Sequence, residues 1–389
     1  RPKLRFPGFD EPWEDTLFSD LYEAANEKND GSFGVESIIS VANMYFKEDA
    51  RITDEGYLKT YNIFKVGDIA FEGNKSNDFS HGRFVENTIG DGIVSHVFVV
   101  FKPLHDTHNL RYWKYAINNE SVMGRILARC TKKTTMMTNL VTKDFLNQSI
   151  PCPSAQEQDK IASLLDTISK RIELQKLYVE SLKKYKRGVT AKLIAAIEEK
   201  YPVVRLGDHV TVMRGGSPRP IDAYITNAEN GIRWIKIGDA LPDQLYISDT
   251  KEKIKPEGAK KSRRVYAGDL ILSNSMSFGR PYILKVDGCI HDGWLLIRDE
   301  EKKFDKRFLC FYLASDVTLA QYKKYAAGSC VNNLNSELVA SVEIGMPPIE
   351  QQIRMANILE KIDRQVEAAS TMYLLLSKLR SSLLQQLFI

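Results

Sequence analysis

The sequence predicts an α+β fold of mixed α/β character, in which two globular domains are separated and joined by two long helices that pair as an antiparallel coiled coil. Three observations predict this fold: a segment that occurs twice in register, an apolar seam that follows each copy, and short β-rich runs between turn residues in the remainder. The two copies give the chain a pseudo-two-fold internal repeat.

Length and composition restrict the class of protein. The chain has 389 residues, 43% hydrophobic and 27% charged, which is typical of a globular protein of two or three domains. No apolar run approaches the roughly 18 residues of a membrane span, and no signal-peptide pattern is evident, so we expect a cytoplasmic protein without a membrane partner. Its five cysteines are odd in number and far apart, which favours reduced thiols over disulfides or a zinc site.

The internal repeat sets the domain organisation. Residues 153–173 align with residues 347–367 without a gap at an offset of 194 residues, and Gln158 and Gln352 are among the identical pairs. Upstream, residues 66–69 also resemble residues 267–270. The predicted segments are a first globular domain at 1–152, a first helix at 153–200, a second globular domain at 201–346 and a second helix at 347–389.

Each predicted helix carries an apolar seam. Alternating steps of four and three residues from Ile161, and again from Met355, meet apolar residues at nearly every position, which is the pattern of a coiled coil. A cation interrupts each seam at the same place, Lys186 in one copy and Arg380 in the other. Such a pair either fixes the register of the helices or lies at the edge of the seam, with each charged end group reaching into solvent. The predicted helix-pairing residues are Leu165, Ile168, Ile172, Lys186, Leu359, Ile362, Val366 and Arg380.

The helices are long enough to act as spacers. A helix of about 40 residues is roughly 60 Å long, and a lone amphipathic helix of that length would leave its apolar stripe in water, so the two seams bury each other. The globular domains contain β-rich runs and one further helical segment, at residues 306–315. The predicted strands lie within 95–101, 233–239, 269–273 and 293–298.

The sequence contains no signature of catalysis. We find no GxxxxGK[ST] phosphate loop, no GxGxxG motif, no amino-methyltransferase tetrapeptide and no GxSxG elbow. His105 and His108 have no third ligand nearby, and the charges around Glu300 and Lys302 are typical of a solvated run rather than of a nuclease site. We therefore expect no catalytic residue, no metal ligand and no cofactor on this chain.

Two segments of the second domain have the chemistry of a DNA-facing surface. Arginine suits guanine edges, asparagine suits adenine, and hydroxyls or free backbone amides suit phosphate. Residues 213–220 and 273–281 combine these groups, and residues 72–83 follow a strand at the corresponding place of the first domain. Polar turns alone would look similar, but equivalent placement on a duplicated scaffold favours DNA contact. The candidate DNA-binding residues are Arg214, Gly216, Ser217, Arg219, Ser273, Asn274, Ser275, Ser277, Arg280, Asn74, Lys75, Ser76, Asn77, His81 and Arg83.

Charge is compatible with nucleic acid without requiring it. The chain has 54 Lys and Arg against 50 Asp and Glu, a net charge of +4. Residues 251–264 hold seven Lys or Arg against two Glu, which suits either phosphate binding or a solvated loop. In the first domain, no counterpart of residues 213–220 is evident around residues 29–34.

The whole chain resembles the DNA-specificity subunit of type I restriction-modification systems. The resemblance lies in residues 4–21, in the paired helix starts at 153–173 and 347–367, and in the Gly-Asp-Leu sequence followed by Ser and Asn at 268–275. It implies that each globular domain is a target recognition domain that reads one part of a bipartite, asymmetric site in double-stranded DNA. The helices would set the gap between the two parts.

The same resemblance implies the partners. Two modification (methyltransferase) subunits would dock on the helices and carry S-adenosylmethionine, while restriction subunits, which are ATP-dependent translocases and endonucleases, would use ATP and Mg. A second hypothesis is a non-catalytic adaptor whose coiled coil tethers two protein-binding domains. Two dissimilar domains on two similar helices favour the first hypothesis, because an adaptor has no evident need to diversify both domains.

Overall fold

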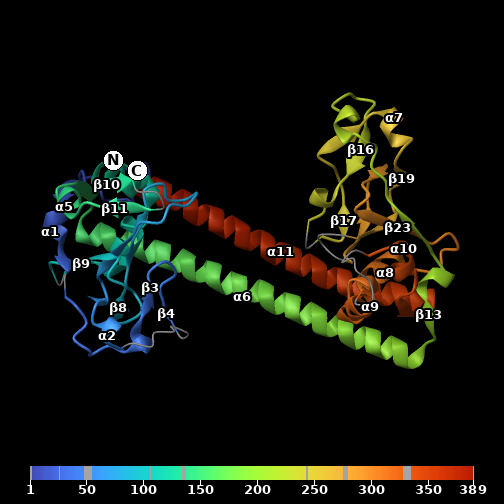
Figure 1. Ribbon diagram of the computed structural model, residues 1–389, viewed down its shortest axis with the longest axis horizontal. Helices are drawn as coiled ribbons and strands as arrows, with labels where there is room; N and C mark the ends of the chain where they lie inside the picture. Colours follow the sequence, from blue (N-terminus) through green and yellow to red (C-terminus); the bar gives the residue numbers. More distant parts are fainter. Residues whose placement is uncertain are drawn as a thin grey trace. The chain divides into compact units, whose positions relative to one another are not determined.

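The computed structural model divides the chain into two compact units. Unit 1 is formed by residues 1–173 and 374–389, and unit 2 by residues 174–373, so each unit contains one globular part and a piece of both long helices (Figure 1). Within the part of the chain that the structure describes, no helix has both the length and the apolar character to cross a membrane. The described residues are 2–25, 27–47, 55–105, 107–133, 137–241, 244–274, 279–326 and 334–388.

Unit 1 is built on a four-stranded antiparallel sheet. In order across the sheet, its strands are β2 (Tyr22–Ala25), β9 (Val99–Pro103), β6 (Ile69–Glu72) and β7 (Arg83–Glu86). Successive residues of a strand point to opposite faces, so Phe84 and Phe101 pack against helices while Val85 and Val100 pack against smaller strands. The helices are α1 (Phe18–Leu21), α3 (Leu110–Ala116), α4 (Glu120–Cys130) and α5 (Thr142–Leu146), and the smaller strands are β3 (Ile39–Ser40), β4 (Tyr45–Phe46), β5 (Asn62–Phe64) and β8 (Gly92–Val94).

Unit 2 repeats this plan and adds strands to it. Its main sheet has the order β14 (Thr211–Arg214), β23 (Trp294–Arg298), β20 (Leu270–Ser273), β21 (Pro281–Leu284) and β17 (Tyr246–Ile247). One face packs against α8 (Lys306–Leu313), α9 (Asp316–Ala326) and α10 (Ser336–Ala340). The other face packs against a second sheet, ordered β15 (Ile225–Thr226), β18 (Glu252–Ile254), β16 (Ile232–Ile235), β22 (Gly288–Ile290) and β19 (Arg263–Val265).

The strands predicted at 233–239, 269–273 and 293–298 correspond to β16, β20 and β23. Of the β-rich run at 95–101, only the second half is strand. Residues 95–98 form a turn, in which the backbone N–H of Phe98 donates to the carbonyl of Ser95 at 3.0 Å, and β9 begins only after it.

Each unit leads into a long helix through a two-stranded antiparallel ribbon. In unit 1, β1 (Glu14–Leu17) pairs with β12 (Ser149–Cys152), and in unit 2, β13 (Val203–Arg205) pairs with β24 (Glu343–Gly345). The second strand of each ribbon precedes a helix, which is α6 (Ala155–Lys200) after β12 and α11 (Ile349–Phe388) after β24.

The predicted antiparallel pairing of the long helices is confirmed within each unit. In unit 1, Leu165 near the start of α6 shares a core with Leu387 near the end of α11. In unit 2, Ile194 near the end of α6 shares a core with Leu359 near the start of α11. All the predicted pairing residues lie on the covered side of their helices: Leu165, Ile168, Leu359, Ile362 and Val366 are buried, and Ile172, Lys186 and Arg380 are half-buried.

Both seam cations lie over aromatic rings. Lys186 Nζ lies 5.3 Å from the ring centroid of Phe311 in α8, and the guanidinium carbon of Arg380 lies 5.9 Å from that of Tyr115 in α3. Lys186 also forms an ion pair with Asp363 of α11. Each cation therefore ties a long helix to the globular part of its own unit, and Lys186 additionally links the two helices.

Further anchors recur at equivalent positions. Arg111 at the start of α3 donates to Asp166 of α6 at 2.9 Å, and Arg307 at the start of α8 donates to Glu360 of α11 at 2.9 Å. Asp166 and Glu360 are 194 residues apart, which is the offset of the sequence repeat. The duplicated segments thus occupy the same structural places in the two units.

The repeated Gly-Asp turn has the same geometry in both units. Gly67 and Gly268 have φ angles of +93° and +89°, a left-handed conformation that glycine adopts without strain. The carboxylates of Asp68 and Asp269 then accept the backbone N–H of the residue three positions earlier, at 2.7 and 2.9 Å.

Glu86 distinguishes the two main sheets and generates a prediction. It is 3% exposed, and among the residues that the structure describes neither of its carboxylate oxygens has a hydrogen-bond partner. Burial raises its pKa to about 9 despite the nearby Lys114. By strand register its counterpart in β21 is the buried Ile283. Because the folded-state pKa lies above the unfolded-state value, the folded protein loses stability as the pH rises between about 4.5 and 9.

We therefore expect Glu86→Ile and Glu86→Gln to stabilise unit 1 more at pH 8 than at pH 5. The stabilisation relative to wild type should grow by at most about 1.4 kcal/mol per pH unit. Urea denaturation of the full chain at the two pH values checks this, with Glu23→Gln, at an exposed residue of β2, as the control. A gain in stability that is the same at both pH values would contradict the buried-carboxyl explanation.

Candidate nucleic-acid interface

Three connecting segments meet at one edge of the main sheet of unit 2. They are residues 215–220 after β14, residues 274 and 279–280 at the ends of β20 and β21, and the turn 291–293 between β22 and β23. They meet because β23 begins beside the ends of both β20 and β14 in antiparallel register, with Ser273 opposite Trp294. We call this the loop edge of unit 2. It brings together the two segments that the sequence analysis selected, and it adds a third that was not selected as DNA-facing.

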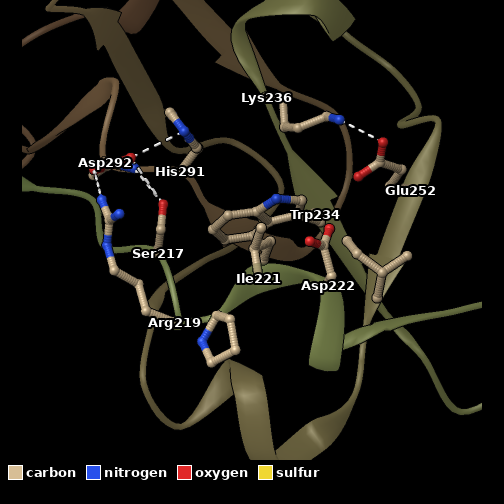
Figure 2. Close-up of a pocket in the computed structure, with 11 residues that line it drawn as sticks. Ser217, Arg219, Ile221, Asp222, Trp234, Lys236, Glu252, His291 and Asp292 are labelled. Atoms are coloured by element: carbon tan, nitrogen blue, oxygen red, sulfur yellow. Dashed lines mark hydrogen bonds and ion pairs between the residues drawn. The ribbon is translucent and has the colours of Figure 1, made fainter.

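Asp292 connects the segments of this loop edge. Its carboxylate accepts a hydrogen bond from Ser217 Oγ at 2.8 Å and from the Arg219 guanidinium at 3.4 Å (Figure 2). Its backbone oxygen accepts hydrogen bonds from Arg214 Nε at 3.3 Å and from Asn274 Nδ2 at 3.0 Å. One residue thus holds four of the sequence-selected side chains.

The environment of Asp292 keeps it ionised. His291 Nδ1 accepts the backbone N–H of Gly293 at 2.9 Å, so the ring carries its proton on Nε2, which lies 2.9 Å from the Asp292 carboxylate. Burial alone raises the pKa of Asp292, but the hydrogen bond from Ser217 and the neighbouring His291 and Arg219 side chains outweigh burial, and its pKa lies below the usual value. Asp292 therefore remains an acceptor for Arg219 at neutral pH.

Arg214 and Arg219 of this edge are open to solvent. The Arg219 side chain is 81% exposed and Arg214 is also exposed. A guanidinium group has five N–H donors, so the hydrogen bond of one Arg219 guanidinium nitrogen to Asp292 leaves donors for a ligand. Asp292 orients Arg219 without covering it.

A pocket of about 950 Å³ opens beside Arg219 (Figure 2). Trp234, which is 1% exposed, and Ile221 contribute its apolar lining. The ion pair between Lys236 and Glu252 contributes polar lining on another side. The pocket thus extends the loop edge with both hydrogen-bond donors and acceptors.

The basic stretch at 251–264 continues this surface. Its end adjoins the loop edge, because Arg263 Nε donates to the backbone oxygen of Arg214 at 3.1 Å and Ser262 Oγ donates to that of Gly216 at 2.6 Å. Arg263 and Arg264 are exposed. Positive charge therefore extends from the arginines of the loop edge along β19.

Several residues selected from the sequence serve the fold instead of facing solvent. Ser273 and Asn274 are buried, and Ser273 Oγ accepts the backbone N–H of the half-buried Arg280 at 3.0 Å. The Gly216 N–H donates to the carbonyl of Ile290 at 3.2 Å. The expectation that this N–H would be free to bind a phosphate is therefore wrong. These residues support the edge because neighbouring strands enclose the end of β20. The candidates Ser275 and Ser277 lie outside the described residues.

Unit 1 has an equivalent loop edge, formed by residues 27–31, 73–82 and 95–98. Strand register establishes the equivalence, because Ala25 pairs with Val100 in unit 1 as Met213 pairs with Leu296 in unit 2. Residues 27–31 are therefore the counterpart of residues 215–219, which the sequence alone did not locate.

The hairpin 73–82 exposes some of the candidate DNA-binding residues of the first domain to solvent. At its tip, Ser76 Oγ accepts the backbone N–H of Phe79 at 3.1 Å and closes the turn. His81 is half-buried, and its Nδ1 lies 3.0 Å from Ser80 Oγ. The exposed candidates are Asn74, Lys75, Ser76 and Asn77.

The expectation that Arg83 would face a ligand is wrong, because its guanidinium group is used within the fold. Its Nε donates to the buried Glu72 carboxylate at 2.7 Å, and another guanidinium nitrogen donates to the carbonyl of Ala42 at 2.7 Å. Since breaking this pair would leave Glu72 buried and unpaired, Arg83 is a structural residue of the hairpin.

Comparison with known families identifies related chains. The family model described as the type I restriction modification DNA specificity domain matches this chain over residues 19–184 and again over residues 198–372. The chain is 26% identical over 266 residues to the type I restriction enzyme MjaVIII specificity subunit of Methanocaldococcus jannaschii, covering 60% of this chain and 60% of that protein. It is 25% identical over 258 residues to the putative MjaX specificity subunit of the same organism, covering 61% and 57%. The alignments thus span about three fifths of these relatives.

Two solved structures share the fold. The S subunit of the type I restriction-modification system of M. genitalium aligns over 100% of this chain and 99% of its own, with a TM-score of 0.62 and 15% identity. A chain from a structural study of complex assembly and conformational transition of the type I R-M system aligns over 100% and 99%, with a TM-score of 0.59 and 16% identity.

The contacts of Asp292 generate a prediction about stability. Asp292→Asn should cost unit 2 about 1 kcal/mol at pH 7, because the charge that holds Arg219 and Ser217 is lost. Since the pKa of Asp292 is lowered by folding, this contribution is present above its unfolded-state pKa of about 4 and is lost as the pH falls through the folded-state value. Urea denaturation at pH 7 and pH 3 measures the difference, with Asp222→Asn, an exposed carboxylate of the same pocket, as control. Equal effects of the two substitutions at pH 7 would contradict the assigned role.

Proposed function

The chain belongs to the type I restriction-modification DNA specificity family, and from this premise we propose that it is the DNA-reading specificity subunit of a type I restriction-modification complex, without catalytic activity of its own. The observation that carries the proposal is the pair of equivalent loop edges, one in each unit. Each edge presents exposed donors and cations from segments that the sheet holds in place, which is the chemistry required to contact base edges and phosphates.

The two loop edges carry different side chains, which supports the reading of an asymmetric, bipartite site. The edge of unit 2 exposes Arg214 and Arg219, whose guanidinium groups match guanine O6 and N7. The edge of unit 1 exposes Lys75, Ser76 and Asn77 on its hairpin instead. Equivalent scaffolds with different contact residues recognise different base sequences.

A second apolar stripe on each long helix supports docking of two modification subunits. Tyr178 and Tyr185 of α6 are 53% and 58% exposed, and residues of α11 at the same repeat offset of 194 residues, Met372 and Leu379, are 44% and 47% exposed. Exposed apolar surface of this kind marks protein interaction sites. Two copies of one partner would bind at the two equivalent stripes and bring S-adenosylmethionine, while ATP and Mg would act on the restriction subunits.

Arg219→Gln tests the DNA-reading role. In the complex with the partner subunits, we expect the variant to relax base preference in one half-site by roughly 5- to 150-fold, with little change on non-specific DNA. Selection of sites from randomised duplex DNA measures this. Lys302→Gln is the matched control, because Lys302 is exposed beyond the opposite end of β23. Equal weakening on all sequences would instead indicate a phosphate contact, and a wild-type complex that selects no bipartite site would favour the adaptor hypothesis.

Lengthening both helices tests their role as the spacer. The units divide after Glu173 in α6 and after Tyr373 in α11, so seven residues inserted at each point preserve the alternating seam and avoid the packing around Lys186. Seven helical residues add about 10.5 Å, or about three base-pair rises of 3.4 Å. We expect the gap in the selected site to grow by about three base pairs while both half-sites stay the same. An unchanged gap would show that the helices do not set it, and insertion into α6 alone is the control for misaligned seams.

A further inference from the structure

The turn 95–98 of unit 1 corresponds to residues 291–294 of unit 2. The first joins β8 to β9 as the second joins β22 to β23, and in both turns the N–H of the last residue donates to the carbonyl of the first at 3.0 Å. By this register, His96 occupies the place of Asp292. The central position of each loop edge therefore carries a different functional group in the two units.

The tip of this turn is exposed and combines apolar and aromatic groups. Val97 is 64% exposed and His96 is also exposed. Tyr57 of the short helix α2 (Glu55–Leu58) is 45% exposed, and its ring meets the His96 ring edge-on with centroids 6.4 Å apart. Exposed valine, histidine and tyrosine side chains on one surface are typical of a contact surface.

A buried amide holds this surface rigidly. Asn62 is 7% exposed, its Nδ2 donates to the carbonyl of Phe98 at 2.9 Å, and its Oδ1 accepts Lys28 Nζ at 2.6 Å. Lys28 also donates to the carbonyl of Thr60 at 3.0 Å, next to the exposed Lys59. The turn, the segment after β2 and the end of α2 are therefore tied together before any ligand binds, and two lysines flank them.

We propose that the base-reading surface of unit 1 is formed by the tip His96 and Val97, supported by Tyr57 and flanked by Lys28 and Lys59, and that it contacts one half-site of duplex DNA. This inference rests on the proposed function and specifies which residues of unit 1 would read the bases. An imidazole N–H donates to the O6 or N7 of guanine, and the valine methyl groups fit the C5-methyl of thymine. The lysines suit the phosphates on either side.

The experiment compares two double variants of the full chain in complex with its partner subunits. Sites are selected from randomised duplex DNA by wild type, by His96→Ala with Val97→Ala, and by a hairpin-tip variant, Lys75→Ala with Asn77→Ala, which tests the competing assignment of base reading to the hairpin. Lys302→Gln, at an exposed residue of unit 2 away from both loop edges, is the control. We expect the turn variant to lose base preference by roughly 5- to 150-fold at one or two positions of one half-site. The half-site that responds to Arg219→Gln should remain unchanged, which also shows that the variant protein is folded and assembled.

A phosphate contact has a separate readout. Lys59→Ala should weaken binding about equally on all sequences and reduce the dependence of affinity on salt concentration. Unchanged preference in the turn variant, together with relaxed preference in the hairpin variant, would overturn the inference and assign base reading to the hairpin. If the wild-type complex selects no sequence, the proposed function fails and this inference fails with it.

Discussion

The apolar seam between α6 and α11 is the interaction on which both units depend. Each unit completes its core with turns from both helices: Leu165 and Leu387 pack together in unit 1, and Ile194 and Leu359 pack together in unit 2. Because these residues lie far apart in the chain, neither globular part can bury its helix-facing surface with contiguous sequence alone. Burial of apolar area is the dominant favourable term in folding, so the stability of both units is coupled to the pairing of the helices.

Outside the seam, the two units share their supports and differ in what the supports carry. The shared features are buried or tightly bonded, such as the Gly-Asp turns at Gly67 and Gly268 and the carboxylates that anchor α3 and α8 to the long helices. One difference lies at the loop edges, where Asp292 and His96 occupy one equivalent place. A duplicated scaffold of this kind allows each edge to change its contacts without disturbing the fold, as the reading of two different half-sites requires.

The loop edge of unit 2 also shows how an acidic residue can serve a surface proposed to bind DNA. Asp292 carries the charge that phosphates repel, yet it is half-buried and surrounded by Ser217, Arg219 and His291. Its charge is compensated locally, and its effect is to orient an arginine that is itself open to solvent. The exposed donor and its buried support are thus separate residues, and only the donor is visible as a DNA-binding residue type in the sequence.

The sequence by itself determined the repeat, which is visible as a direct alignment of two segments. It also determined the two helices and their seams, because the spacing of apolar residues that defines a seam recurs in each successive heptad. The sequence also located the repeated Gly-Asp pairs and the polar segment 72–83 that follows a strand, because their residue types have short-range conformational preferences. Only the tertiary structure decided that Ser273, Asn274 and Arg83 are used within the fold and that Asp292 and His96 lie at the centre of the edges. The reason is that exposure at the end of a strand depends on which neighbouring strands enclose it, and strand order and register join segments that are distant in the chain.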